Sequence, residues 1–69
     1  MDGSKVIKQL LLERNITKEE LADQLGIKKQ SMHNKLNRGT YSLAEFERII
    51  NFLDAEILIQ TTDTKKIFN

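Results

Sequence analysis

The fold of this chain is decided by residues 16–53, which read ITKEELADQLGIKKQSMHNKLNRGTYSLAEFERIINFL. The stretch holds two capping boxes, in which a hydroxyl residue is followed three positions later by glutamate: Thr17 with Glu20, and Ser42 with Glu45. Gly26 lies between the boxes, where a residue without Cβ favours the end of a helix. The stretch therefore predicts one helix from the first box to Gly26, another close behind it, and a third that starts at the second box.

Apolar residues three and four positions apart predict a buried face on each of these helices. Met32 and Leu36 mark this face in the middle helix. The last helix, which we expect to run to about Leu53 and to be closed by Asp54, carries the stripe Leu43, Phe46, Ile49, Ile50 and Leu53. Each capping box is flanked by residues placed to form a hydrophobic staple: Ile16 with Leu21, and Tyr41 with Phe46.

The segments on either side of this stretch differ in character. Before it, the apolar spacing predicts a helix over Lys5–Arg14, with Ser4 as its N-cap and Asn15 at its end. After it, the β-branched residues of Ile57–Thr62 predict a strand, either alone or paired back with Lys66–Phe68 as a hairpin. We therefore expect an all-α bundle of four helices with a C-terminal strand or short hairpin. The predicted division is residues 1–55 for the helical domain and residues 56–69 for the tail.

Positive charge gathers in one segment of a chain whose formal net charge is only +1. No acidic residue stands between Asp23 and Glu45, and the cations of that interval are Lys28, Lys29, Lys35 and Arg38. Lys28 and Lys29 stand at a predicted helix N-terminus, where a cation opposes the helix dipole by about 0.3 to 1 kcal/mol. Folding alone does not favour them there, so this segment predicts contact with a polyanion.

The quoted stretch resembles the Cro and phage-repressor type of helix-turn-helix domain, also called XRE-like, and the resemblance covers about Val6 to Leu53. Its most specific matches are the small residues of the turn, Ala22 and Gly26, and the buried positions Leu21, Leu25, Ile27 and Met32. Two residues depart from the family pattern. Lys28 stands where the cap of the third helix is usually Ser or Thr, and Lys35 stands where an apolar residue is frequent.

The resemblance makes Lys28–Asn37 the recognition helix, which lies in the major groove of DNA. Gln30 and Asn34 stand one turn apart, and each amide can bond N6 and N7 of adenine. The predicted base-reading residues are Lys29, Gln30, Ser31, His33 and Asn34. The predicted contacts to the DNA backbone are Lys28, Lys35, Asn37, Arg38, Thr40 and Tyr41. For each of these residues the simpler alternative is a solvated surface side chain, or for Tyr41 a staple.

Other classes of protein are disfavoured by the composition. The chain has no cysteine and one histidine, so we expect no disulfide and no metal site. We see no nucleophile with its base, no glycine-rich phosphate loop and no carboxylate pair, so we expect no catalytic residue and no cofactor. No apolar run is long enough to span a bilayer, and Met1–Ser4 lacks a signal-peptide pattern, so we expect a cytoplasmic location and no membrane partner.

The predicted function is therefore a sequence-specific DNA-binding regulator, by resemblance a repressor of phage or bacterial type. Its partner would be double-stranded DNA with a palindromic operator, bound by a homodimer that pairs through Ile57, Leu58 and Ile59. The alternative is an antitoxin, or a module that binds another protein through the same tail and for which DNA binding is secondary.

Overall fold

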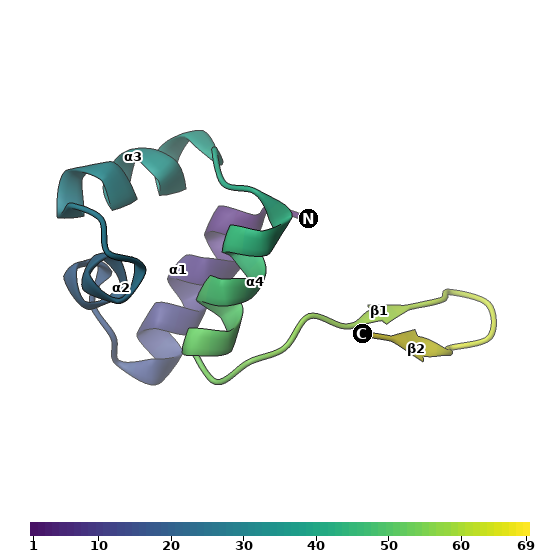
Figure 1. Ribbon diagram of the computed structural model, residues 1–69. Helices are drawn as coiled ribbons and strands as arrows, with labels where there is room; N and C mark the ends of the chain where they lie inside the picture. The colour runs from purple at the N-terminus through teal and green to yellow at the C-terminus, as the bar shows by residue number, and fades with distance from the viewer.

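Four helices pack together and a short hairpin follows them in a computed structural model that describes residues 1–69 (Figure 1). The helices are α1 (Gly3–Arg14), α2 (Lys18–Leu25), α3 (Lys29–Arg38) and α4 (Leu43–Phe52), and the strands are β1 (Ile59–Gln60) and β2 (Ile67–Phe68). This architecture confirms the predicted all-α class with a C-terminal hairpin. None of the helices has the length and apolar character needed to cross a membrane.

Three helix boundaries lie where the sequence predicts: the starts of α2 and α4 and the end of α2. Both capping boxes are present, with the amide of Glu20 donating to Thr17 Oγ1 and the amide of Glu45 donating to Ser42 Oγ, each at 3.1 Å. Gly26 ends α2 at a φ of 70°, a left-handed conformation that costs a residue with a Cβ about 1 kcal/mol or more. These local signals need no tertiary partner, which is why the sequence shows them.

The start of α1 corrects one prediction, because its N-cap is Asp2 and not Ser4. The Asp2 carboxylate accepts hydrogen bonds from the backbone amides of Ser4 and Lys5, so the helix begins earlier than the spacing suggested. Ser4 is buried within the first turn, and its Oγ lies 2.9 Å from the Tyr41 hydroxyl. Aspartate and serine are comparable N-caps, and here the serine hydroxyl is used for a contact with the loop before α4.

All four helices contribute to one buried core. Its members are Ile7, Leu11, Leu21, Ala22, Met32, Leu36, Phe46, Ile49, Ile50 and Leu53. At the far end of α1, the Arg14 guanidinium donates to the carbonyl oxygens of Leu53 at 2.9 Å and Asp54 at 3.1 Å. The arginine thus ties the end of α1 to the end of α4.

Leu43 was predicted to lie on the buried stripe of α4, and this is wrong: it is 77% exposed. It is the first residue of the helix, and it lies beside the tail rather than under another helix. The nearby apolar contact is made instead by Tyr41, whose ring stacks on Phe46 with centroids 5.8 Å apart, as the predicted staple requires.

The tail forms a hairpin, but its strands are shorter than predicted. The strand predicted over Ile57–Thr62 is reduced to Ile59–Gln60, which pairs antiparallel with Ile67–Phe68 in the register Ile59 to Phe68 and Gln60 to Ile67. Asp54, at a φ of 56°, redirects the chain after α4, and Ile57 packs back on the helical core. Residues 55–58 are therefore a link and not a strand. The hairpin projects from the helices (Figure 1), giving the molecule extents of 42 × 23 × 17 Å.

Candidate nucleic-acid interface

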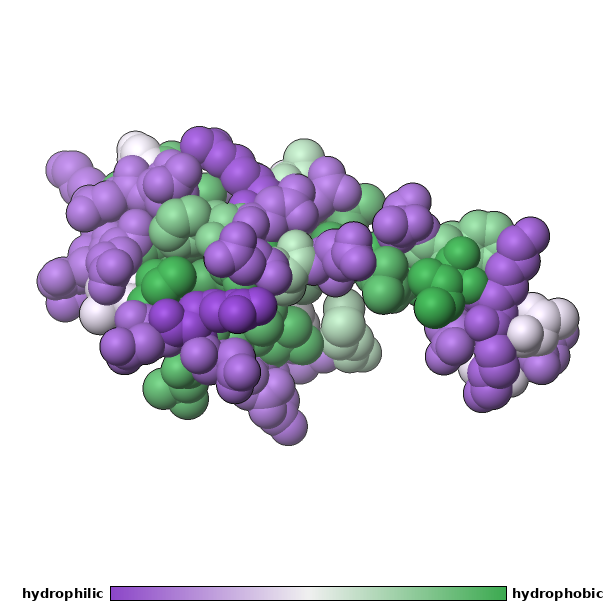
Figure 2. Space-filling view, turned by 90° about the horizontal axis from the view of Figure 1, so that it is seen from below, coloured by the Kyte–Doolittle hydropathy of each residue, from purple (hydrophilic) through white to green (hydrophobic).

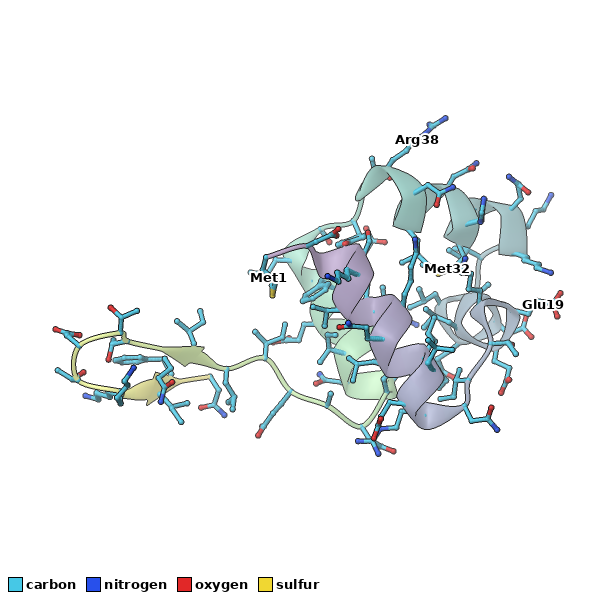
Figure 3. The ribbon with its side chains drawn as sticks, turned by 180° about the vertical axis from the view of Figure 1, so that it is seen from behind. Met1, Glu19, Met32 and Arg38 are labelled. Atoms are coloured by element: carbon cyan, nitrogen blue, oxygen red, sulfur yellow. The ribbon has the colours of Figure 1, made fainter.

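Helices α2 and α3 form a unit that presents α3 at the surface. Ala22 is buried in α2, and its carbonyl accepts a hydrogen bond from the amide of Ile27 at 3.0 Å, which closes the turn after Gly26. Met32 and Leu36 are fully or almost fully buried, and Met32 points inward from α3 (Figure 3). On the opposite face of α3, Gln30, His33 and Asn37 are exposed and Asn34 is half-buried.

This outer face is polar and uncharged, as the sequence predicts. Gln30 Nε2 donates to Asn34 Oδ1 at 3.3 Å, and Asn37 Nδ2 lies 3.0 Å from His33 Nε2. In each pair the two residues stand one helical turn apart, and the hydrogen bond between them faces solvent. Each amide keeps further donors and acceptors free, because a carboxamide has two N–H donors and an oxygen with two lone pairs. The face is therefore an aligned row of groups suited to hydrogen-bonding the edges of bases.

The N-terminal end of α3 lacks a side-chain cap. Lys28 occupies the N-cap position and forms no capping hydrogen bond. The first amides of a helix have no partner within it, and they attract anions together with the helix dipole. Lys28 and Ser31 are exposed at this end, so a phosphate approaching α3 would meet a cation and the start of the helix together.

Two of the predicted cations are paired within the chain. Lys29 Nζ lies 2.8 Å from Glu19 of α2, and Lys35 Nζ lies 3.1 Å from Glu45 of α4. The hydrogen bond from Lys29 holds the pKa of Glu19 below its ordinary value, and the hydrogen bond from Lys35, supported by the backbone at Ser42, does the same to the pKa of Glu45. The Lys35 side chain is only 29% exposed, because it lies between α3 and α4. A lysine is accommodated at this inward position because Glu45 neutralises it.

The remaining predicted backbone contacts follow α3. Arg38 points away from the helices into solvent (Figure 3), and Thr40 is exposed in the loop beyond it. Tyr41 is half-buried, with its ring on Phe46 and its hydroxyl beside Ser4. Of these three, only Arg38 and Thr40 have polar groups without a partner in the chain.

Lys18 belongs to this surface although it was not predicted. It lines a shallow hollow with Lys29, Gln30 and His33, at the point where the start of α2 faces α3. The sequence could have identified Lys18, because this residue directly follows the cap Thr17 and so places a cation at the N-terminus of α2, where it opposes the helix dipole. Lys28 has the same unfavourable position at the start of α3.

The three residues predicted to pair in a dimer do not share one strand. Ile57 packs on the core of its own chain, whereas Leu58 is 49% and Ile59 is 66% exposed. Ile59 and its cross-strand partner Phe68 share a hollow with Leu43 of α4. Figure 2 shows apolar atoms along the link and on the near part of the hairpin.

Comparison with known families gives one match. A sequence profile described as the Cro/C1-type HTH DNA-binding domain matches residues 6–57, which is most of the chain and includes the whole of α2 and α3. No curated protein and no solved structure is significantly similar to the chain.

Proposed function

Since the chain belongs to the Cro/C1-type helix-turn-helix DNA-binding family, we propose that it is a sequence-specific transcriptional regulator, a repressor of phage or bacterial type. The observation that carries this proposal is the row of Gln30, His33, Asn34 and Asn37 on the outer face of α3, in which all but the half-buried Asn34 are exposed. An α-helix fits the major groove, where base edges present distinct patterns of donors and acceptors. An uncharged amide row distinguishes those patterns, whereas a row of lysines would bind any sequence through phosphates.

In this proposal the exposed groups divide by role. Gln30, Ser31, His33 and Asn34 read bases, whereas Lys28, Asn37, Arg38 and Thr40 contact the sugar-phosphate backbone. Lys29 and Lys35 reach DNA only if they leave Glu19 and Glu45, so we expect them to contribute less than Lys28 and Arg38. Lys18 joins the backbone contacts because it lies beside Lys29 and His33.

We also propose that two copies bind a palindromic operator. A dimer places two recognition helices about 34 Å apart, so that both meet the same side of the duplex. The hairpin supports this, because a two-stranded sheet is marginal alone and this one exposes Ile59, Ile67 and Phe68, next to the exposed Leu58 of the link. Covering them with a second copy would bury apolar surface and also complete the sheet edges.

Selection of bound duplexes from a random DNA library tests the proposed function. We expect enrichment of one palindromic sequence, and retardation of that sequence at concentrations where scrambled DNA of the same length stays free. Recovery of the input library without enrichment, at every salt concentration tried, would contradict sequence-specific regulation.

The exposed apolar hairpin also favours a second candidate, an antitoxin or other protein-binding module. In this case the hairpin binds a different protein and DNA binding is secondary. Sedimentation of the pure chain distinguishes the two, because a regulator that dimerises through the hairpin associates alone, whereas a module that needs a foreign partner stays monomeric until that partner is added.

A further inference from the structure

A cleft of about 660 Å³ lies between α1 and the C-terminal end of α3, where it adjoins the predicted DNA-backbone contacts Asn37 and Arg38. Its polar lining comes from Ser4, Lys5, Lys8 and Gln9 of α1, from Asn37 and Arg38 of α3, and from Asp2. Lys5, Lys8 and Gln9 share one face of α1, because they are three and four positions apart. This face was not among the predicted functional residues.

The cations of the cleft have no acidic partner. The ion pairs of the chain are Lys29 with Glu19 and Lys35 with Glu45, which leaves Lys5, Lys8 and Arg38 unpaired. Lys5 lies in the first turn of α1, where a cation opposes the helix dipole, and it stands one turn from Lys8, where like charges repel. Folding alone does not favour this placement, whereas a bound anion would offset both costs.

The one carboxylate in the cleft, Asp2, is already engaged. Its Oδ1 accepts from the amides of Ser4 at 3.1 Å and Lys5 at 3.3 Å, so its charge is directed at the start of α1. Three cations against one capping carboxylate leave the cleft net positive.

We propose that this cleft binds a phosphate group, held by Lys5 and Lys8 with Gln9 and Asn37 as amide donors and with Arg38, whose side chain points outward, at the rim. The inference deepens the proposed function and rests on it for the source of the phosphate. Asn37 and Arg38 belong both to the cleft and to the predicted backbone contacts of α3, so a DNA strand leaving the reading face passes the mouth of the cleft. A free phosphate compound is the other source of the same chemistry.

The first test compares two variants, Lys8→Gln alone and Lys5→Gln combined with Lys8→Gln, with the matched control Arg48→Gln. Arg48 is exposed on α4, outside the cleft, the reading face and the hairpin, and its loss changes the net charge as much as the loss of Lys8. Binding to the selected site is titrated over a range of salt, on a duplex with long flanks and on one without flanks. We expect the log-log salt slope to fall in magnitude by about one for each lysine on flanked DNA, with no such fall for the control or on the flankless duplex.

A gain-of-function variant gives an independent readout. Asp2→Asn keeps an N-cap of comparable strength and removes the negative charge from the cleft. We expect it to bind flanked DNA more tightly than Asp54→Asn, a change of the same charge at an exposed residue after α4.

The second test uses inorganic phosphate and the DNA-free protein. We expect phosphate at millimolar concentration, but not chloride at equal ionic strength, to shift the amide resonances of Lys5, Lys8 and Arg38, and the double variant to lose these shifts. If phosphate shifts these resonances but the lysine variants do not change the salt slope of DNA binding, the cleft is a phosphate site whose ligand is a free phosphate compound and not DNA. Unchanged slopes together with absent shifts overturn the proposal. If the unaltered protein binds no DNA at all, the proposed function fails, and the phosphate titration alone decides the cleft.

Discussion

Single side chains on α3 carry the predicted discrimination between sequences. We expect Gln30→Ala and Asn34→Ala each to cost about 1 to 3 kcal/mol on the selected site and to relax the preference at one base position. Because Gln30 and Asn34 are hydrogen-bonded to each other, the losses should not add in the double variant. Retardation assays on the selected and the scrambled duplex measure both effects.

The control for this pair is Gln24→Ala, which removes an exposed amide from α2. It should leave binding to both duplexes unchanged. If Gln30→Ala and Asn34→Ala weaken binding to the scrambled duplex as much as binding to the selected one, these amides do not read bases.

Gly3 allows the N-terminal turn of α1 to approach the loop before α4. A Cβ at this position would lie 2.8 Å from the Tyr41 hydroxyl oxygen, closer than such atoms pack, and 3.1 Å from Phe46 Cε1, which is a tight contact. We expect Gly3→Ala to lower the free energy of unfolding by about 1 to 3 kcal/mol, despite the better helix propensity of alanine. Chemical denaturation measures the change.

The control is the same substitution in a Tyr41→Phe background, which removes the oxygen of the closest contact. Gly3→Ala should cost less there than in the unaltered chain. An equal cost in both backgrounds would mean that the hydroxyl is not the obstacle.

The pairings of individual lysines could not be read from the sequence. Lys28 and Lys29 are adjacent and show the same charge signal, yet Lys29 is held by Glu19 and Lys28 is not. The partner of each lysine depends on how α2, α3 and α4 pack, and a spacing along one helix does not contain that information. The cleft lined by Lys5 and Lys8 could not be predicted for the same reason, because its other side is formed by α3, which is distant in sequence.

Helices α3 and α4 are joined electrostatically through Lys35 and Glu45. The pKa of Glu45 is lowered in the folded state, first by Lys35, so the carboxylate stabilises the fold above its ordinary pKa of 4.5. That stabilisation is lost as the pH falls through the lower folded-state pKa. We expect Glu45→Gln, which keeps a residue suited to the capping box, to flatten the acid dependence of unfolding below about pH 5.

Glu47→Gln is the matched control, because Glu47 is exposed on the same helix and has no ion-pair partner. Thermal unfolding followed between mildly acidic and strongly acidic buffers compares the two variants. Identical acid profiles for both would show that the pair with Lys35 does not contribute to stability.

Helix boundaries were predictable where a local signal decides them, and less so where packing does. The boxes at Thr17 and Ser42 and the turn at Gly26 depend on neighbouring residues, and the structure confirms them. Ser4, the predicted cap of α1, lies inside the helix instead, and its hydroxyl contacts Tyr41, which is distant in sequence. The predicted strand is shorter than expected for a similar reason: the side chain of Ile57 packs on the helical core, and the residue does not pair with another strand.

The hairpin offers a prediction about the whole assembly. We expect a chain ending at Ile57, which keeps the residues that pack on the core, to be a helical monomer that binds a palindromic site much more weakly than the full chain. Sedimentation and far-UV circular dichroism test this. The full-length variant Ile59→Asp should reproduce the effect without a change of length, since it places a charge on the exposed face of β1.

A truncated chain that remains dimeric would place the interface elsewhere. In that case the exposed start of α4 at Leu43 becomes the next surface to alter.

The two long-range ties of α1 have a consequence for the order in which the chain folds. Ser4 meets Tyr41 and Arg14 meets Leu53, partners 37 and 39 residues apart, whereas α2 and α3 are neighbours in sequence. Closing a long loop costs entropy before its contacts form, so we expect the α2–α3 unit to assemble early and α1 to dock on α4 last. Arg14→Ala should then accelerate unfolding and leave the refolding rate nearly unchanged in denaturant-jump kinetics. Slower refolding would instead put the docking of α1 in the rate-limiting step.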